Sequence, residues 1–320
     1  MDRPPQSATP PPGPPPAARS ALRRRGLLIL QLAVAALLLV TLVVFVDWRS
    51  LLARLAAIEP WSLAAAGLAL AAVLLVGAFD LWVLLRGLAP LSYGAVLRIY
   101  VIGWSSFLVL PGSAGDAVQI LFFKEADVGY REGTGVYLTD KLITLAFNVA
   151  LALAGGWLFL RGRILPDLVA LLAVAVGVLA LVAWRLVRPP RHRFVEWGVS
   201  VVAFAAGYAR RHPRRIAVNA AGTALKLVLG ALPYWIVLHG LGIAVSPPVV
   251  LLATYTAGLV AYVPVAFNGL GTVELAAVAL YGSQGVPADA VLGLYLVIRA
   301  LVVVLAIVGF ALSTAGRRRR

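Results

Sequence analysis

The sequence predicts an all-α, polytopic integral membrane protein, a helical bundle of six full spans and two re-entrant broken-helix segments arranged as an inverted repeat. Three observations predict this fold. Of the 320 residues, 62% are hydrophobic and 13% are charged, whereas soluble domains are about 45–50% apolar and about 25% charged. The apolar residues form long runs of Leu, Ala and Val, unlike the short alternating segments of a membrane β-barrel. Proline and glycine interrupt two of these runs.

Six apolar runs are long enough to cross a bilayer as helices. About 20 residues rise about 30 Å in an α-helix, which matches the thickness of the hydrocarbon core. The predicted spans are residues 26–46, 62–85, 136–160, 168–186, 216–238 and 291–312. The apolar piece at 199–208 is too short to cross, and because arginines flank it we expect it to lie along the membrane interface.

The ends of the chain differ in composition from the spans. Residues 1–22 are rich in proline and cannot bury a core, which predicts a disordered cytoplasmic tail. Residues 23–316 form the predicted transmembrane domain. The four arginines at 317–320 form a basic cytoplasmic tail.

The two interrupted runs cover residues 99–123 and 249–281. The helix breakers are Pro111, Gly112 and Gly115 in the first run, and Pro264, Gly269 and Gly271 in the second. An acid follows each break, Asp116 in the first and Glu274 in the second. In lipid an unpaired backbone polar group costs several kcal/mol, so broken backbone belongs inside protein or against a water-filled cavity. Paired breaks in corresponding halves of a chain indicate a transporter's binding site, although two loops between ordinary helices remain the alternative.

The distribution of basic residues favours re-entrant segments. With the amino terminus in the cytoplasm and both breaks re-entrant, most basic residues fall inside: positions 23–25, Arg86, Arg98, Lys124, Arg131, the arginines of 188–215 and those of 317–320. Four fall outside: Arg49, Arg54, Arg161 and Arg163. If only one broken segment spanned, a large basic cluster would be translocated, against the positive-inside rule. This predicts a protein of the inner (cytoplasmic) membrane with both termini in the cytoplasm.

Composition also narrows the function classes. A formal net charge of +15 would suggest nucleic acid in a soluble protein, but here basic residues cluster at the ends of apolar runs, so no nucleic-acid partner is expected. The chain has no cysteine, and its three histidines are scattered. We therefore expect no metal, no cofactor and no thiol chemistry.

Charged side chains within the runs are the candidate binding residues. Lys226 and Arg299 lie near the middle of their spans, where a charge costs about 2.5–3.5 kcal/mol. Glu274 is the expected partner of both, which leaves an excess of positive charge suited to an anionic headgroup. The first half adds Asp116, Gln119, Asp140 and Lys141 nearer the cytoplasmic face. A static charge cluster that only fixes helix packing is the alternative.

These motifs resemble a known family. L-P-G-S-A-G-D, the T-D-K at 139–141, V-P-x-x-x-x-G-L-G-x-x-E and a late arginine resemble the lysylphosphatidylglycerol synthase transmembrane-region family over about residues 25–315. The matching positions are Pro111, Gly112, Gly115, Asp140, Pro264, Gly269, Leu270, Gly271, Glu274 and Arg299. The family commonly has Glu at Asp116, Arg at Gln119 and Pro-Gly at Phe267 and Asn268. The loss of an arginine at Gln119 leaves the charged ligand undefined.

The resemblance implies a flippase-like membrane domain without aminoacyl-transferase activity, and so not an enzyme. The leading hypothesis is a transporter of a membrane lipid, an anionic phospholipid or a lipid-linked headgroup. One alternative is a non-catalytic partner of a separate membrane-associated glycosyltransferase or lipid synthase. The other is a membrane enzyme acting on a lipid headgroup, with Asp116, Asp140 and Glu274 as acid and base, although no nucleophile motif accompanies them.

Overall fold

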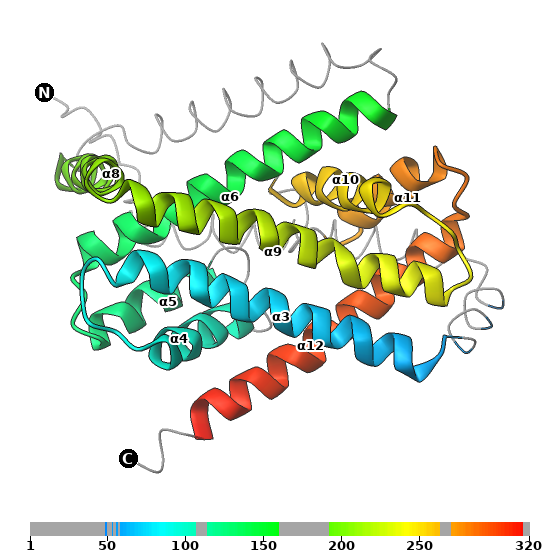
Figure 1. Ribbon diagram of the computed structural model, residues 1–320, viewed down its shortest axis with the longest axis horizontal. Helices are drawn as coiled ribbons and strands as arrows, with labels where there is room; N and C mark the ends of the chain where they lie inside the picture. Colours follow the sequence, from blue (N-terminus) through cyan, green and yellow to red (C-terminus); the bar gives the residue numbers. More distant parts are fainter. Residues whose placement is uncertain are drawn as a thin grey trace, which may run out of the picture.

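The computed structural model describes residues 58–106, 114–159, 192–262 and 270–315, together with positions 49, 53 and 56. Every regular element in these ranges is a helix, which confirms the all-α fold class (Figure 1). Four described helices are long and apolar enough to cross a membrane: α3 (Pro60–Leu85), α6 (Tyr130–Phe159), α9 (Pro213–Gly240) and α12 (Ala288–Ala315). They confirm four predicted runs as helices. The predicted spans 26–46 and 168–186 lie outside the described residues.

The centre of the bundle is the pair α3 and α9, which run side by side in opposite directions (Figure 1). Each begins with a proline in its first turn, where the missing N–H costs nothing because that group has no partner inside a helix. α12 crosses this pair and also contacts α4. The long helix α6 packs against α8 and against α10.

Each interrupted run consists of two short helices that pack together. The first contains α4 (Tyr93–Ser105) and α5 (Ala114–Glu125), and the second contains α10 (Pro247–Gly258), the 3-10 turn η2 (Leu259–Tyr262) and α11 (Thr272–Gly282). These helices have 11–13 residues, about 17–20 Å at 1.5 Å per residue, so none can cross the core alone. The breakers Pro111, Gly112, Pro264 and Gly269 lie outside the described residues.

The buried apolar residues form two separate clusters, one around each helix pair. The first joins the end of α3 to α4, α5 and the start of α6, with Phe123 and Val136 fully buried. The second joins the end of α9 to α10, α11 and α12, with Tyr281 and Leu294 fully buried. In Figure 1 the two pairs accordingly lie toward opposite ends of the bundle.

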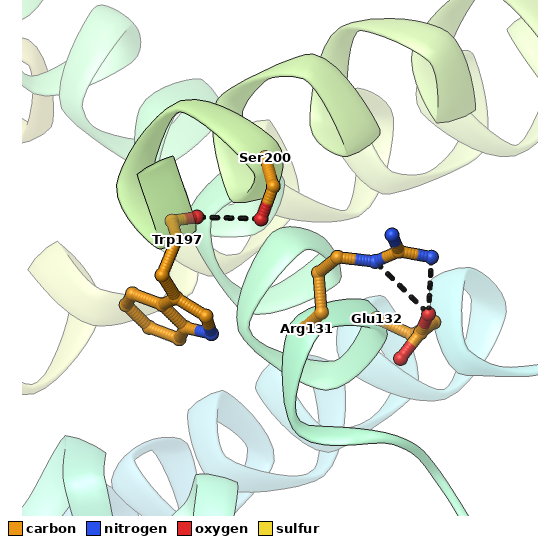
Figure 2. A network of polar contacts seen from close by, with 4 residues as sticks. All are labelled: Arg131, Glu132, Trp197 and Ser200. Carbon is orange, nitrogen blue, oxygen red and sulfur yellow. Dashed lines mark hydrogen bonds and ion pairs between the residues drawn. The ribbon is translucent and has the colours of Figure 1, made fainter. Parts of the chain in front are cut away.

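Helix α8 (His192–Arg211) is longer than the apolar piece predicted at 199–208. Figure 1 looks almost along its axis while α3 and α9 run across the view, so α8 is steeply inclined to them. Val201, Ala205 and Tyr208 lie on its buried face, while Val199 and Val202 are exposed. α8 packs against α6, where Arg131 lies 6.0 Å from the ring centroid of Phe204. Figure 2 shows polar contacts within each helix: Ser200 donates to the Trp197 backbone oxygen in α8, and Arg131 binds Glu132 at 2.8 Å in α6. An exposed apolar face on an inclined helix fits the predicted interfacial position.

Candidate functional site: two ion pairs inside the bundle

The first ion pair joins the two central helices. Lys226 Nζ of α9 lies 3.2 Å from Asp80 Oδ2 of α3. The Asp80 side chain is fully buried, and that of Lys226 is 12% exposed. The predicted pairing of Lys226 with Glu274 is therefore wrong. The physical reason is that α9 packs more extensively against α3 than against any other described helix. This packing places Asp80 of α3 beside Lys226.

Asn219 connects this pair to a second acid. Its Nδ2 donates to the backbone oxygen of Asp80 at 3.1 Å and to Asp140 Oδ1 of α6 at 2.9 Å. Asp140 is buried and interacts electrostatically with Lys226. Asp80, Asp140, Asn219 and Lys226 thus form one buried group, named here the Asp80 cluster, across three of the four candidate spans.

A glycine makes room for the cluster. A Cβ at Gly222 of α9 would lie 1.8 Å from Asp80 Oδ1, so only glycine lets the two helices approach with this carboxylate between them. Asn219, Thr223 and Lys226 share one face of α9 because they are spaced four and three residues apart. The polar face of α9 and the small residue within it together hold Asp80.

The remaining predicted residues of the first half lie in different places. Gln119 is buried and donates to the Tyr100 backbone oxygen at 3.4 Å, which ties α5 to α4. Lys141 lies on the exposed side of α6, with its ammonium 5.0 Å from the ring centroid of Tyr137. Asp116 and Gly115 lie in the first turn of α5, where the structure describes the backbone only. The structure therefore brings Asp140 and Lys226 together and separates Lys141 from them.

The second ion pair lies at the start of α11. Arg299 Nε of α12 donates to Glu274 Oε1 at 2.5 Å, as the sequence predicted. The other carboxylate oxygen, Oε2, accepts the backbone N–H of Gly271 at 2.8 Å. Gly271 has φ of +80°, in the left-handed region that favours glycine, and it precedes the first helical residue. The carboxylate also lies in the first turn of α11, where the helix dipole favours negative charge.

Arg299 is the more accessible member of this pair. Its side chain is 35% exposed, against 9% for Glu274. The pair uses Nε alone, so Glu274 leaves the two terminal amino groups of the guanidinium unused. Tyr234 and Tyr295, whose rings meet edge-on at 5.4 Å, interact electrostatically with both ions. The arrangement places a fork of donors near two tyrosine side chains, Tyr234 and Tyr295.

A comparison with known protein families places the chain in one of them. Residues 28–309 match the profile of the family described as the lysylphosphatidylglycerol synthase TM region. The chain belongs to this family. The match covers α3, α6 and α9 completely, α12 as far as Gly309, both broken segments and both ion pairs, and it confirms the resemblance drawn from the motifs. No curated protein matches the chain.

Sequence reasoning missed Asp80, Asn219 and Gly222. Arg86 is the basic residue nearest to Asp80 in this part of the sequence, but its guanidinium lies 4.6 Å from the ring centroid of Trp82. The available signal was the polar stripe of Asn219, Thr223 and Lys226 within an apolar run. Such a stripe predicts an inward-facing polar surface and a partner on a neighbouring helix. Within the described residues, no group of three His, Cys, Asp or Glu side chains is placed to hold a metal.

Proposed function

We propose that this chain is a transporter of the flippase type, which moves a membrane lipid or lipid-linked headgroup across the cytoplasmic membrane. The observation that carries the proposal is the Glu274–Arg299 pair, a partly exposed arginine far from either end of a long apolar helix. A charge at the bilayer centre costs about 2.5–3.5 kcal/mol, so such residues usually mark a pathway or a ligand site. Family membership supports a membrane-embedded role of this kind.

The chemistry of Arg299 supports an anionic headgroup as the ligand. A guanidinium binds phosphate or carboxylate with two parallel N–H···O bonds, whereas an ammonium acts as a point charge. Glu274 neutralises Arg299 through Nε and leaves the two terminal amino groups unengaged by that carboxylate, on a side chain that is 35% exposed. We therefore propose that a phosphate-bearing headgroup binds Arg299, and that aminoacyl transfer is not part of this chain's activity.

The order of helices supports alternating access. A long helix, a pair of short helices and a long helix occur in succession twice, as α3, α4–α5, α6 and again as α9, α10–α11, α12. The first helices of the two sets, α3 and α9, are antiparallel neighbours (Figure 1). We propose that the short pairs are re-entrant, open to opposite sides, and related as an inverted repeat, the architecture of many secondary transporters.

The charges at the two ends of the bundle support an orientation. One end carries basic side chains at the end of α3, the joint of α5 with α6 and the joint of α8 with α9: Arg86, Lys124, Arg131, Arg210, Arg211, Arg214 and Arg215. At the other end, the joints 240–246 and 283–287 carry no lysine or arginine. By the positive-inside rule we propose that the basic end faces the cytoplasm, with both termini on that side.

The test is lipid movement by the chain alone. Purified protein is reconstituted into liposomes that contain a headgroup-intact fluorescent anionic phospholipid, and accessibility to an impermeant quencher is followed. We expect faster movement than in empty liposomes, and at least a tenfold loss for Arg299→Lys because bidentate phosphate contact is lost. Arg211→Lys, at the exposed end of α8, is the matched control and should retain the rate.

If the wild-type chain moves lipid no faster than empty liposomes, the transport proposal is wrong. Activity that appears only after a synthase or glycosyltransferase is added would instead identify a non-catalytic membrane partner. A labelled lipid that is chemically altered during the assay would identify an enzyme.

A further inference from the structure

The Asp80 cluster holds an unbalanced charge. Two carboxylates, Asp80 and Asp140, face one ammonium, that of Lys226, and both acids are buried. With all three groups ionised the cluster has one net negative charge inside an apolar bundle. Burying an ionised group without compensation is so costly that the group usually takes up a proton instead.

Within the described residues, the groups that interact with Asp80 include one cation, Lys226. In the described part of the chain, Asp80 interacts with Lys226 and Thr223 of α9 and with Asp140 of α6. α4 contributes the phenol of Tyr100, which interacts with Lys226. α12 also packs against α3, and its Arg299 pairs with Glu274. Arg86, on the same helix as Asp80, lies over Trp82.

Hydrogen-bond donors are scarce in the cluster. Within the described structure, Asn219 Oδ1 and both Asp80 carboxylate oxygens are buried outside any regular hydrogen bond; Lys226 Nζ lies 3.2 Å from Oδ2, and the Thr223 hydroxyl is the other group of α9 that interacts with the carboxylate. A carboxylate is an acceptor only, whereas a protonated carboxyl adds an O–H donor. A proton on the cluster therefore removes the excess charge and adds a hydrogen-bond donor. A metal cation would instead face the Lys226 ammonium, which repels it.

We propose that the Asp80 cluster binds and releases one proton per chain, and that this proton is the coupling ion of the transporter. The proton comes from water and joins one carboxylate oxygen of the Asp80–Asp140 pair, which changes from COO⁻ to COOH. Lys226 stays an ammonium and is then paired with one carboxylate instead of two. Because Asp80 lies on α3 and Lys226 on α9, the change acts at the contact between the two proposed repeats.

The coupling role rests on the proposed transport function, but proton binding does not. The first experiment therefore needs no transport. Infrared difference spectra are recorded on reconstituted protein as pH falls from about 9 to about 5, a range that covers buried carboxyl groups. We expect the carbonyl stretch of one protonated carboxyl to appear within this range in the wild type.

Substitutions in the Asp80 cluster test whether the carbonyl band comes from its carboxyl groups. Asp80→Asn should abolish the band, and Asp140→Asn should weaken proton binding, because it removes the negative charge that acts on the Asp80 carboxylate. Asp127→Asn is the matched control: Asp127 is exposed in the α5–α6 joint at φ of +58°, which asparagine tolerates, so the band should remain. Lys226→Gln should strengthen proton binding at least tenfold, and this shift keeps the test decisive if either Asp variant fails to fold.

The absence of a titrating carboxyl band, or a band unchanged in Asp80→Asn, Asp140→Asn and Lys226→Gln alike, would overturn the proposal. A second experiment separates coupling from binding. Lipid movement in liposomes should change at least threefold when a pH gradient is imposed, and Asp80→Asn should remove that response. Lipid movement without a gradient response would refute coupling and leave transport standing, whereas a titrating band without lipid movement would refute transport and leave the proton site standing.

Discussion

The two ion pairs of the bundle have the same ingredients and opposite surroundings. Asp80–Lys226 is enclosed by α3, α6 and α9, with both side chains at most 12% exposed. Glu274–Arg299 lies at the start of a short helix beside a broken segment, with Arg299 35% exposed. Enclosure suits the proton site proposed for the first pair, and exposure suits the headgroup site proposed for the second. Access, more than the presence of charge, distinguishes their proposed roles.

The two ion pairs also differ in their basic residue, which is lysine in the enclosed pair and arginine in the more exposed pair. Lysine is a compact charge, and its neighbours Asp80 and Asp140 compete for it. Arginine is planar, and Glu274 engages only one of its three nitrogens. In the proposed proton site, two carboxylates share one ammonium, so that one carboxylate can take up a proton. In the proposed headgroup site, the guanidinium keeps N–H donors that Glu274 does not engage. The predictions below test this contrast between the two regions.

The largest effect is expected when Lys226 is removed. Lys226→Met leaves the Asp80 carboxylate buried without its cation, which costs about 3–5 kcal/mol. The thermal unfolding midpoint in detergent should fall sharply at neutral pH. It should fall less at acid pH, because protonation of the stranded carboxylate removes the buried charge. The double variant Asp80→Asn/Lys226→Met should recover most of the loss, and an unchanged midpoint in the single variant would show that the pair contributes nothing.

A smaller loss is expected from added bulk beneath Asp80. Gly222→Ala places a Cβ where only 1.8 Å separates it from Asp80 Oδ1, and overpacking of this kind costs about 1–3 kcal/mol. Gly67→Ala on α3 is the matched control, because nothing lies within 4 Å of its Cβ. The unfolding midpoint should fall only for Gly222→Ala. Equal midpoints for the two variants would show that α3 and α9 separate without penalty.

The third effect concerns the open site. Gly271→Ala and Gly242→Ala both force a left-handed residue, at φ of +80° and +74°, which costs about 1–2 kcal/mol. Their stabilities should fall alike. Lipid movement in liposomes should fall only for Gly271→Ala, because the Gly271 N–H holds Glu274 in place. Gly271→Leu should abolish lipid movement while membrane insertion persists, and full activity in both Gly271 variants would reduce the break to an ordinary loop.

The smallest effect on the protein is expected from single cysteine substitutions, which test the side of the membrane that each end of the bundle faces. The chain has no cysteine, so single cysteines can be labelled selectively. Ser283→Cys, exposed between α11 and α12, should react with an impermeant reagent added outside intact cells. Arg211→Cys, exposed at the end of α8, should react only after the membrane is permeabilised. Gly133, near the start of α6, is a poorer internal probe because it is buried against Phe123. The reverse pattern would invert the proposed topology.

The sequence predicted what depends on local composition. The helices α3, α6, α9 and α12 coincide with four long apolar runs, since hydrophobicity over about 20 residues decides whether a helix can span. Both broken segments were recognised because Pro and Gly act on the backbone where they stand. The Glu274–Arg299 pair was also predicted, and its members are only 25 residues apart on consecutive helices.

The sequence did not predict contacts that depend on how distant helices pack. Arg86 is the basic residue that follows Asp80 in the sequence, but six residues turn a helix so that two side chains point about 120° apart. Lys226 was assigned to Glu274 because both lie deep in the membrane, and depth alone does not say which helices are neighbours. Asp80 meets Lys226 only because α3 packs along α9, and that packing is a property of the whole bundle.

The most direct test of the account is whether anionic lipid stabilises the protein through Arg299. The unfolding midpoint is measured in detergent with added anionic phospholipid, and with zwitterionic phospholipid as the control, for wild type, Arg299→Lys and Asp80→Asn. We expect anionic lipid to raise the midpoint of wild type and Asp80→Asn. Arg299→Lys should keep its lipid-free midpoint, because a lysine can still pair with Glu274, but should lose most of the rise. If Arg299→Lys and Glu274→Gln instead lower the lipid-free midpoint in step with activity, and lipid does not restore it, the pair serves packing and the headgroup site is wrong.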